Sequence, residues 1–206
     1  MNIKDAAKKF WHFIWESDSN WSLLANVILA IILVKFIVYP GLGFLFGTSY
    51  PVVAVVSGSM EHDGSFEDWW NSAAACNGQR CSQSDWYALQ EITQEEFQEY
   101  SFKNGFNKGD IMVLYGIEPK NIKTGDVIVF VSQENGDPII HRVITISSDG
   151  KYIYTTKGDH NSDSGSIDEN IPEEAIIGKA VFRIPVLGWI KIIAVELLKM
   201  ITSVFV

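Results

Sequence analysis

The strongest candidate for chemistry in this sequence is a serine in a turn of small residues. Ser59 lies in the stretch Ser57-Gly58-Ser59-Met60, directly after Pro51–Val56, a strand-like run rich in β-branched residues. The small residues before Ser59 permit a tight turn that presents its hydroxyl and a backbone N–H to a carbonyl group. The pattern therefore predicts a nucleophilic serine, with a plain strand-ending turn as the alternative.

A serine nucleophile needs a base, and one histidine is well placed for that role. His141 lies in Ile139–Ile144, where strand alternation puts it on one face with Ile139 and Val143. Partial burial on that face keeps an imidazole neutral and ready to accept a proton. The other histidines precede the apolar N-terminal segment or lie in polar stretches: His12, His62 and His160.

A predicted hairpin brings an acid towards His141. The Asp-Gly pair at 149–150 favours a two-residue turn, which places His141 opposite Gly158. Asp159 is next along the chain and Asp163 lies in the loop beyond. Directly opposed residues have Cβ atoms about 5 Å apart, so a carboxylate from either position can orient the imidazole, as in Ser-His-Asp chemistry. The hairpin leaves the choice between Asp159 and Asp163 open.

An apolar segment near the N-terminus predicts a membrane anchor over residues 22–47. Ser22–Phe46 carries Lys35 as its only charge. Its roughly 25 residues are enough to cross a hydrocarbon core about 30 Å thick, because a helix rises about 1.5 Å per residue. Pro40-Gly41 should kink or end the regular helix.

The basic residues predict how this anchor is oriented in the cell membrane. Lys4, Lys8 and Lys9 precede the apolar segment, and the next basic residue after it is Arg80. Because positive charge is retained on the cytoplasmic side, we expect an amphipathic cytoplasmic N-terminus over residues 1–21 and an extracytoplasmic remainder after Thr48.

The remainder predicts a mainly β catalytic domain over residues 48–185. Five runs rich in β-branched residues are separated by Gly and Asp: Pro51–Val56, Ile111–Tyr115, Val127–Val131, Ile139–Ile146 and Tyr152–Thr156. Residues 186–206 are apolar but carry Lys191, Glu196 and Lys199. This C-terminal stretch predicts a membrane-associated helix, either lying in the outer interface or crossing the membrane.

An acidic, aromatic insertion over residues 61–107 interrupts the strand pattern. Helix-start signals at Ser65 and Thr93 predict two short helices. The insertion is either a packed surface flap or a docking face for a partner. Cys76 and Cys81 lie close together in this predicted external segment, which favours a disulfide.

Composition limits the classes of function. The chain has 206 residues and a net charge of −9, which argues against a nucleic-acid partner because phosphate binding needs clustered Lys and Arg. Its two cysteines alone cannot supply the four ligands of a structural zinc site.

Several motifs in order resemble the type I signal peptidases, in their archaeal and eukaryotic branch, and we favour an archaeal member. His141 stands where the bacterial branch has a lysine. The resemblance covers most of the chain outside Glu61–Asn107 and rests on six segments: PVVAVVSGSM (51–60), GDIMVLYG (109–116), GDVIVF (125–130), IIHRVI (139–144), TKGDHNSD (156–163) and IIGKAVFRIP (176–185).

Two positions depart from the family pattern. In the family the serine motif usually runs on to a proline, whereas here it continues as Met60-Glu61-His62-Asp63. The family's final acid usually lies further beyond the Gly-Asp pair than Asp163 does.

The resemblance implies a signal-peptidase-like β fold with an N-terminal transmembrane helix, a short helical insertion and a C-terminal apolar helix. It implies a serine endopeptidase that removes signal peptides from secretory precursors. In it, Ser59 attacks, His141 is the base, Asp159 or Asp163 orients it, and the Ser59 amide with the Ser57 hydroxyl stabilises the oxyanion. The implied partners are signal peptides, membrane lipid, and the secretion translocon or accessory subunits. No metal or cofactor is implied. The alternatives are a catalytically silent substrate-binding subunit and a related membrane protease with a narrow precursor set.

Overall fold

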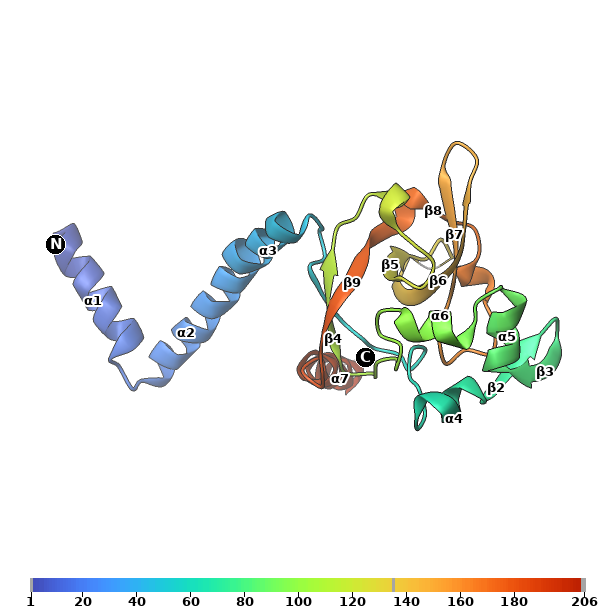
Figure 1. Cartoon of the computed structure of the whole chain (residues 1–206). Coiled ribbons are helices and arrows are strands. Elements are labelled where there is room, and N and C mark those ends of the chain that lie inside the picture. Colours follow the sequence, from blue (N-terminus) through green and yellow to red (C-terminus); the bar gives the residue numbers. More distant parts are fainter. Residues whose placement is uncertain (1, 135, 205–206) are drawn as a thin grey trace. The chain divides into compact units, whose positions relative to one another are not determined.

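The computed structural model describes residues 2–134 and 136–204, with the backbone alone at 198 and 201–204. The chain forms two units, Met1–Leu45 and Phe46–Val206. Their helices and strands are labelled in Figure 1.

The N-terminal unit consists of helices. Helix α1 (Ile3–Trp15) is followed by α2 (Asn20–Leu33), which continues through a π-helical turn, η1 (Val34–Val38), into α3 (Tyr39–Phe46). Ser19 caps α2 by accepting a hydrogen bond from the Ser22 amide. Two further hydrogen bonds tie the second helix to α1: Ser22 Oγ donates to the Phe13 carbonyl, and Asn26 Nδ2 donates to the Ile14 carbonyl.

The continuous helix Asn20–Phe46 has 27 residues and contains an 18-residue window with a mean hydropathy of 2.4, so by length and composition it can cross a membrane. It begins and ends close to the predicted span, but it does not end at Pro40. In the π-helical turn just before the proline, the Tyr39 amide bonds to the Val34 carbonyl, five residues back. This wider turn makes room for the proline ring, which otherwise clashes with the preceding turn of an α-helix. The orientation of the helix stays a prediction.

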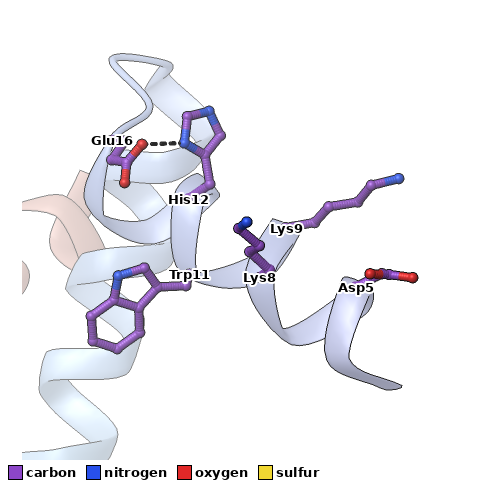
Figure 2. Close-up of a pocket in the computed structure, with 6 residues that line it drawn as sticks. All are labelled: Asp5, Lys8, Lys9, Trp11, His12 and Glu16. Carbon is purple, nitrogen blue, oxygen red and sulfur yellow. Dashed lines mark hydrogen bonds and ion pairs between the residues drawn. The ribbon is translucent and has the colours of Figure 1, made fainter. Parts of the chain in front are cut away.

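Helix α1 has the amphipathic character expected of residues 1–21. A hollow beside it is lined by charged and aromatic side chains (Figure 2): Asp5, Lys8, Lys9, Trp11, His12 and Glu16. His12 Nδ1 lies 2.5 Å from Glu16 Oε2, one helical turn away. The hollow contains none of the residues predicted to do chemistry.

The second unit is built on a seven-stranded sheet, with strand order β1-β4-β9-β5-β6-β7-β8 and antiparallel neighbours throughout. The strands are β1 (Val52–Ala54), β4 (Ile111–Tyr115), β5 (Val127–Val131), β6 (Pro138–Ser148), β7 (Tyr152–Lys157), β8 (Ile171–Pro172) and β9 (Ile176–Ile184). The mainly β body is therefore confirmed. Strands β4 and β5 have the predicted ends, whereas the first predicted strand is shorter and β6 is longer.

Apolar clusters pack against both faces of β5, because successive side chains of a strand point to opposite sides. Val127 and Val129 pack into one apolar cluster, and Ile128 and Phe130 pack into another on the opposite face. Strand β6 pairs with β5 so that His141 lies opposite Ile128. His141 therefore lies on the predicted face.

The hairpin from β6 to β7 contains two departures from the expected pairing that cancel each other. Its turn is one residue longer than predicted, since Ser148 pairs with Tyr152. A β-bulge between Val143 and Thr145 then takes up the extra residue. Beyond the bulge Arg142 pairs with Lys157, which is the register predicted beside His141.

The insertion leaves the body and returns to it at one place, because the Phe106 amide donates to the Met60 carbonyl at 2.9 Å. It contains three short helices rather than two, α4 (Phe66–Trp70), α5 (Gln83–Leu89) and α6 (Gln94–Glu99). Between them lies a hairpin of β2 (Ala73–Cys76) and β3 (Gln79–Ser82). The Cys76–Cys81 disulfide is present in this hairpin. Buried aromatic rings fill the core of the insertion: Trp69, Trp70, Trp86, Tyr87 and Phe97.

Short 3-10 turns complete the body, at η2 (Pro119–Asn121), η3 (Ser166–Asp168) and η4 (Glu173–Ala175). The chain then forms helix α7 (Trp189–Val204). Its start is fixed to the sheet domain, because the Gly188 amide donates to the Gly109 carbonyl at 2.7 Å. Residues 205–206 of the predicted C-terminal stretch lie outside the described residues, and whether the helix lies in the interface or crosses the membrane stays open.

Candidate active site

Ser59 lies in a tight turn that follows β1. The Glu61 amide donates to the Gly58 carbonyl at 3.0 Å, which closes the turn. Met60 is fully buried in the apolar cluster beneath it. The carboxylate of Glu61 accepts a hydrogen bond from the Lys108 amide. Hydrogen bonds therefore hold the two ends of the insertion together next to the turn that carries Ser59.

The structure brings the predicted nucleophile and base together. His141 Nε2 lies 3.0 Å from Ser59 Oγ, within hydrogen-bonding distance. His141 is 3% exposed, and the centre of its ring lies 6.5 Å from that of the Phe130 ring, at a steep interplanar angle of 66°. The base thus sits on a rigid central strand, and the serine reaches it from the turn.

The carboxylate that orients His141 belongs to Asp168, at the end of η3. Asp168 Oδ1 lies 2.5 Å from His141 Nδ1 and accepts a second hydrogen bond from Thr156 Oγ1. Its other oxygen accepts from the Gly165 amide at 3.3 Å. An ionised carboxylate only accepts hydrogen bonds, so Nδ1 carries the proton and Nε2 is left to accept one from Ser59.

The expected acid, Asp159 or Asp163, is therefore corrected. Asp163 is exposed in the loop after β7. Asp159 lies one residue beyond the position opposite His141, as predicted, but its carboxylate binds Arg142 and His62 instead. The 3-10 turn at 166–168 places the carboxylate of Asp168 next to the imidazole instead.

Asp159 forms the centre of a second buried network. Arg142 Nε and a terminal nitrogen of its guanidinium donate to the two oxygens of Asp159, at 2.9 and 2.7 Å. His62 Nε2 lies 3.0 Å from the same carboxylate. Burial by itself raises the pKa of a carboxyl group, but the Arg142 charge and the His62 hydrogen bond hold the pKa of Asp159 well below its usual range. Since a buried charge is costly without its partner, this network is a structural feature of the domain.

Lys157 is a third buried charge beside the site. Its ammonium donates to Gln83 Oε1 at 2.8 Å and lies over the rings of Trp86 and Tyr87. Burial lowers the pKa of Lys157 to about 8, against the opposing attraction of Asp159 and other carboxylates. The Lys157 nitrogen is hydrogen-bonded to Gln83 of the insertion. The group within hydrogen-bonding distance of the Ser59 hydroxyl is His141.

A cleft of about 360 Å³ opens at the serine. It is mainly apolar, with polar groups at Ser57, Ser59, Asp137, His141 and Asn161. Its other lining residues come from the β1 end, β5, β6 and the Asp168 loop: Val53, Ala54, Val56, Val129, Pro138, Ile139, Ile140 and Ile167. Ser57 Oγ lies 3.2 Å from Ser59 Oγ, so the second hydroxyl is close enough to contact a group attacked by the first.

Sequence reasoning missed Asp168, although one signal pointed to it. The family pattern places its final acid further beyond the Gly-Asp pair than Asp163, and Asp168 fits that description. In residues 2–134 and 136–204, no group of three or more His, Cys, Asp or Glu side chains is arranged to hold a metal ion.

Ser59, His141 and Asp168 are aligned as in a Ser-His-Asp triad, and comparisons with known proteins show which proteins the chain is similar to. The chain is 33% identical over 95 residues to the signal peptidase complex catalytic subunit SEC11 of Plasmodium falciparum, covering 43% of this chain and 50% of that protein. It is 30% identical over 100 residues to human SEC11C, covering 45% and 52%. It is 34% identical over 106 residues to SEC11 of Lachancea thermotolerans, covering 45% and 60%.

The chain thus spans about half the length of the curated relatives it matches. No family model matches the chain. These relatives are catalytic subunits of eukaryotic signal peptidase, so the homologues agree with the branch that the motifs predicted. The expectation of an archaeal member stays a prediction.

Proposed function

We propose that this protein is a membrane-anchored serine endopeptidase that removes signal peptides from secretory precursors. The observation that carries the proposal is the hydrogen-bonded series from Ser59 Oγ through His141 to Asp168. It lies in a chain whose relatives are signal peptidase catalytic subunits. A catalytically silent binding subunit has no need of this alignment, which favours the enzyme over that alternative.

The proposed reaction uses the three side chains in sequence. Ser59 Oγ bonds to the scissile carbonyl carbon while its proton passes to His141 Nε2. Asp168 stabilises the imidazolium that forms. His141 then gives the proton to the leaving amine as the C–N bond breaks, which leaves an ester on Ser59. Water, deprotonated by His141, hydrolyses this ester and restores the serine hydroxyl. The negative charge on the carbonyl oxygen is stabilised by the Ser59 amide and the Ser57 hydroxyl.

The cleft supports a substrate in extended conformation with small side chains. Strand β1 stands at one end of the strand order and pairs with β4. An extended peptide can lie along the cleft at the end of this strand and bind through main-chain hydrogen bonds. Val53, Ala54 and Val129 line the cleft with Ser59, and we expect this apolar lining to accept small residues next to the cut.

The anchor and the relatives suggest where the enzyme works and with which partners. Lysines before the apolar helix support a cytoplasmic N-terminus and an extracytoplasmic catalytic domain at the cell membrane. A substrate held in the same membrane by its signal segment is then presented near the site. The relatives are subunits of a signal peptidase complex, which supports accessory subunits or the translocon as partners here.

The test is cleavage of a signal-bearing precursor by the purified full-length protein in lipid vesicles. We expect the wild type to release the mature domain, and Ser59→Ala and His141→Ala to leave the precursor intact. Ser57→Ala should retain part of the activity, with a loss of about 10²-fold for one oxyanion donor. Full activity in Ser59→Ala would overturn the proposal. The precursors that accumulate when the enzyme is depleted would show whether its substrate set is broad or narrow.

A further inference from the structure

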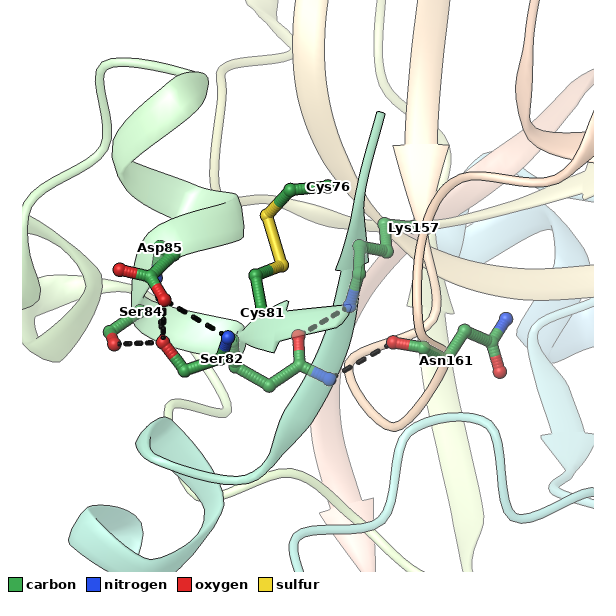
Figure 3. Close-up of a disulfide and its surroundings, with 8 residues drawn as sticks. Cys76, Cys81, Ser82, Ser84, Asp85, Lys157 and Asn161 are labelled. Atoms are coloured by element: carbon green, nitrogen blue, oxygen red, sulfur yellow. Dashed lines mark hydrogen bonds between the residues drawn. A yellow bond between two sulfur atoms is a disulfide. The ribbon is translucent and has the colours of Figure 1, made fainter. Parts of the chain in front are cut away.

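The loop that follows β7 is fastened from outside by the insertion. Gln83 Nε2 donates to the Asn161 carbonyl at 3.0 Å, and Gln83 Oε1 accepts from Lys157 (Figure 3). The Ala75 amide donates to the Ser162 carbonyl at 2.9 Å. Three backbone or side-chain contacts therefore fix the path of the chain from Lys157 to Ser162.

The part of the insertion that makes these contacts is itself rigid. Gln83 is 1% exposed and stands at the first position of α5, where Ser82 and Asp85 form a capping box. The backbone N–H of Gln83 donates to the Ser72 carbonyl at 2.9 Å. The Cys76–Cys81 disulfide closes the preceding hairpin (Figure 3). Gln83 is thus held in place independently of the loop that it binds.

The fastened loop also reaches the reaction centre. The His160 amide donates to the Ser59 carbonyl at 2.8 Å. A Cβ atom on Gly158 would lie 2.7 Å from that carbonyl oxygen, 2.7 Å from Asn161 Nδ2 and 2.9 Å from His141 Nε2. These groups crowd one point, which only a glycine leaves open. The Asn161 side-chain amide and the imidazole nitrogen that handles the proton therefore border the same small space above Gly158, and both residues line the cleft.

This position indicates which part of a substrate meets Asn161. His141 Nε2 must come within hydrogen-bonding reach of the leaving amine to protonate it. The residue that carries this amine, on the C-terminal side of the cut, therefore passes next to Asn161. An extended peptide presents main-chain carbonyl oxygens there, and a side-chain amide can donate to one of them.

We propose that Asn161 donates a hydrogen bond to a main-chain carbonyl oxygen of the substrate just after the scissile bond, and that Gln83 of the insertion positions it. This inference rests on the proposed function and extends it to the leaving half of the substrate. The insertion is accordingly a working part of the active site. Asn161 contacts the substrate, whereas Gln83 acts through Asn161.

The first test compares cleavage of a precursor with labelling of Ser59 by a small fluorophosphonate, which has no peptide after the reacting group. Asn161→Leu keeps a similar volume and removes the donor without adding a charge near His141. We expect its kcat/KM for precursor to fall by about 30- to 100-fold, because one hydrogen bond to the reacting substrate is lost. The labelling rate should stay within about twofold, and Ser162→Ala, which keeps its backbone carbonyl, should match the wild type in both assays.

The second test asks whether Gln83 acts through Asn161. Gln83→Met removes both polar contacts at similar volume, and Gln83→Glu retains the acceptor for Lys157 while losing the donor to the Asn161 carbonyl. We expect both to lower kcat/KM about tenfold. The double variant Gln83→Met with Asn161→Ala should be no worse than Asn161→Ala alone, because coupled residues are not additive.

The substrate contact of Asn161, the role of Gln83 and the proposed function are each contradicted by a different result. Unimpaired cleavage by Asn161→Leu, or a parallel loss of fluorophosphonate labelling, would overturn the substrate contact. Additive effects in the double variant would overturn the positioning role of Gln83. If Ser59→Ala cleaves as well as the wild type, the proposed function itself fails, whatever the result at Asn161.

Discussion

Replacing Asp168 with Asn should remove catalysis while leaving the fold intact. The carboxylate of Asp168 receives hydrogen bonds from His141, Thr156 and Gly165. An asparagine can keep its carbonyl oxygen at the position that accepts from His141 and Thr156, so the imidazole keeps its tautomer. The negative charge that stabilises the imidazolium is lost. Two unit charges about 4 Å apart interact by about 4 kcal/mol at an effective dielectric constant of 20. The expected loss in kcat is therefore about 10³-fold, since 1.36 kcal/mol corresponds to a factor of ten.

Replacing Asp159 with Asn should instead lower the stability of the protein and leave most of its activity. Arg142 and Asp159 are both fully buried, and the substitution leaves the guanidinium charge without its carboxylate. Removing one partner of a buried ion pair typically costs about 3–5 kcal/mol of unfolding free energy. For a domain of this size that corresponds to a fall in Tm of roughly 10 °C or more. Protein that remains folded should keep much of its activity.

Thermal unfolding in detergent and single-turnover precursor cleavage, measured on the same preparations, separate the two variants. Asp163→Asn is the matched control, because its carboxylate is exposed in the same loop, and it should resemble the wild type in both assays. The reasoning is refuted if Asp159→Asn loses about 10³-fold in kcat at an unchanged Tm while Asp168→Asn remains active. That result would make Asp159 the partner of His141.

Two further predictions concern groups beside the site. The pKa of Lys157 is lowered to about 8, whereas an unfolded lysine has a pKa of about 10.4. Between these values the unfolded chain binds more protons, so this group makes stability rise with pH, by roughly 3 kcal/mol at most. Lys157→Met should flatten the increase in Tm between pH 8 and pH 10, and an unchanged pH dependence would contradict the burial of this charge. Gly158→Ala should lower kcat at least 10²-fold, because its Cβ would collide with the Ser59 carbonyl oxygen and His141 Nε2. Gly165→Ala, where the nearest atom is 4.0 Å away, is the control in the cleavage assay; equal activity of the two variants would refute the steric argument.

Local patterns in the sequence predict much of this fold because their causes are local. β-branched runs separated by Gly and Asp specify β4 and β5 with their correct ends. The small residues around Ser59 specify a turn, and strand alternation specifies the face of His141. The uninterrupted apolar stretch specifies a helix long enough to span a membrane. The insertion is predicted less completely. Its capping signal at Ser65 marks a real helix start, but the β2–β3 hairpin is missed, although Asn77-Gly78 is a local signal for the two-residue turn that joins its strands.

The register of the β6–β7 hairpin depends partly on the local sequence and partly on packing across the sheet. The Asp-Gly pair specifies a turn, but its length and the compensating bulge at 143–145 depend on packing across the whole sheet. The register beside His141 is predicted correctly only because these two departures cancel.

Sequence alone thus determines a serine, a histidine on a buried strand, an apolar helix long enough to span a membrane, and an acid somewhere beyond Gly158. Tertiary structure alone decides which acid meets the imidazole. Asp159 is nearer in sequence, but Arg142 on the adjacent strand binds its carboxylate, and the 3-10 turn brings Asp168 to Nδ1 in its place. It likewise decides that Gln83, far away in the insertion, fixes the loop of Asn161. The physical reason is the same in both cases: charge pairing and hydrogen bonding act between groups that meet only when the chain is folded.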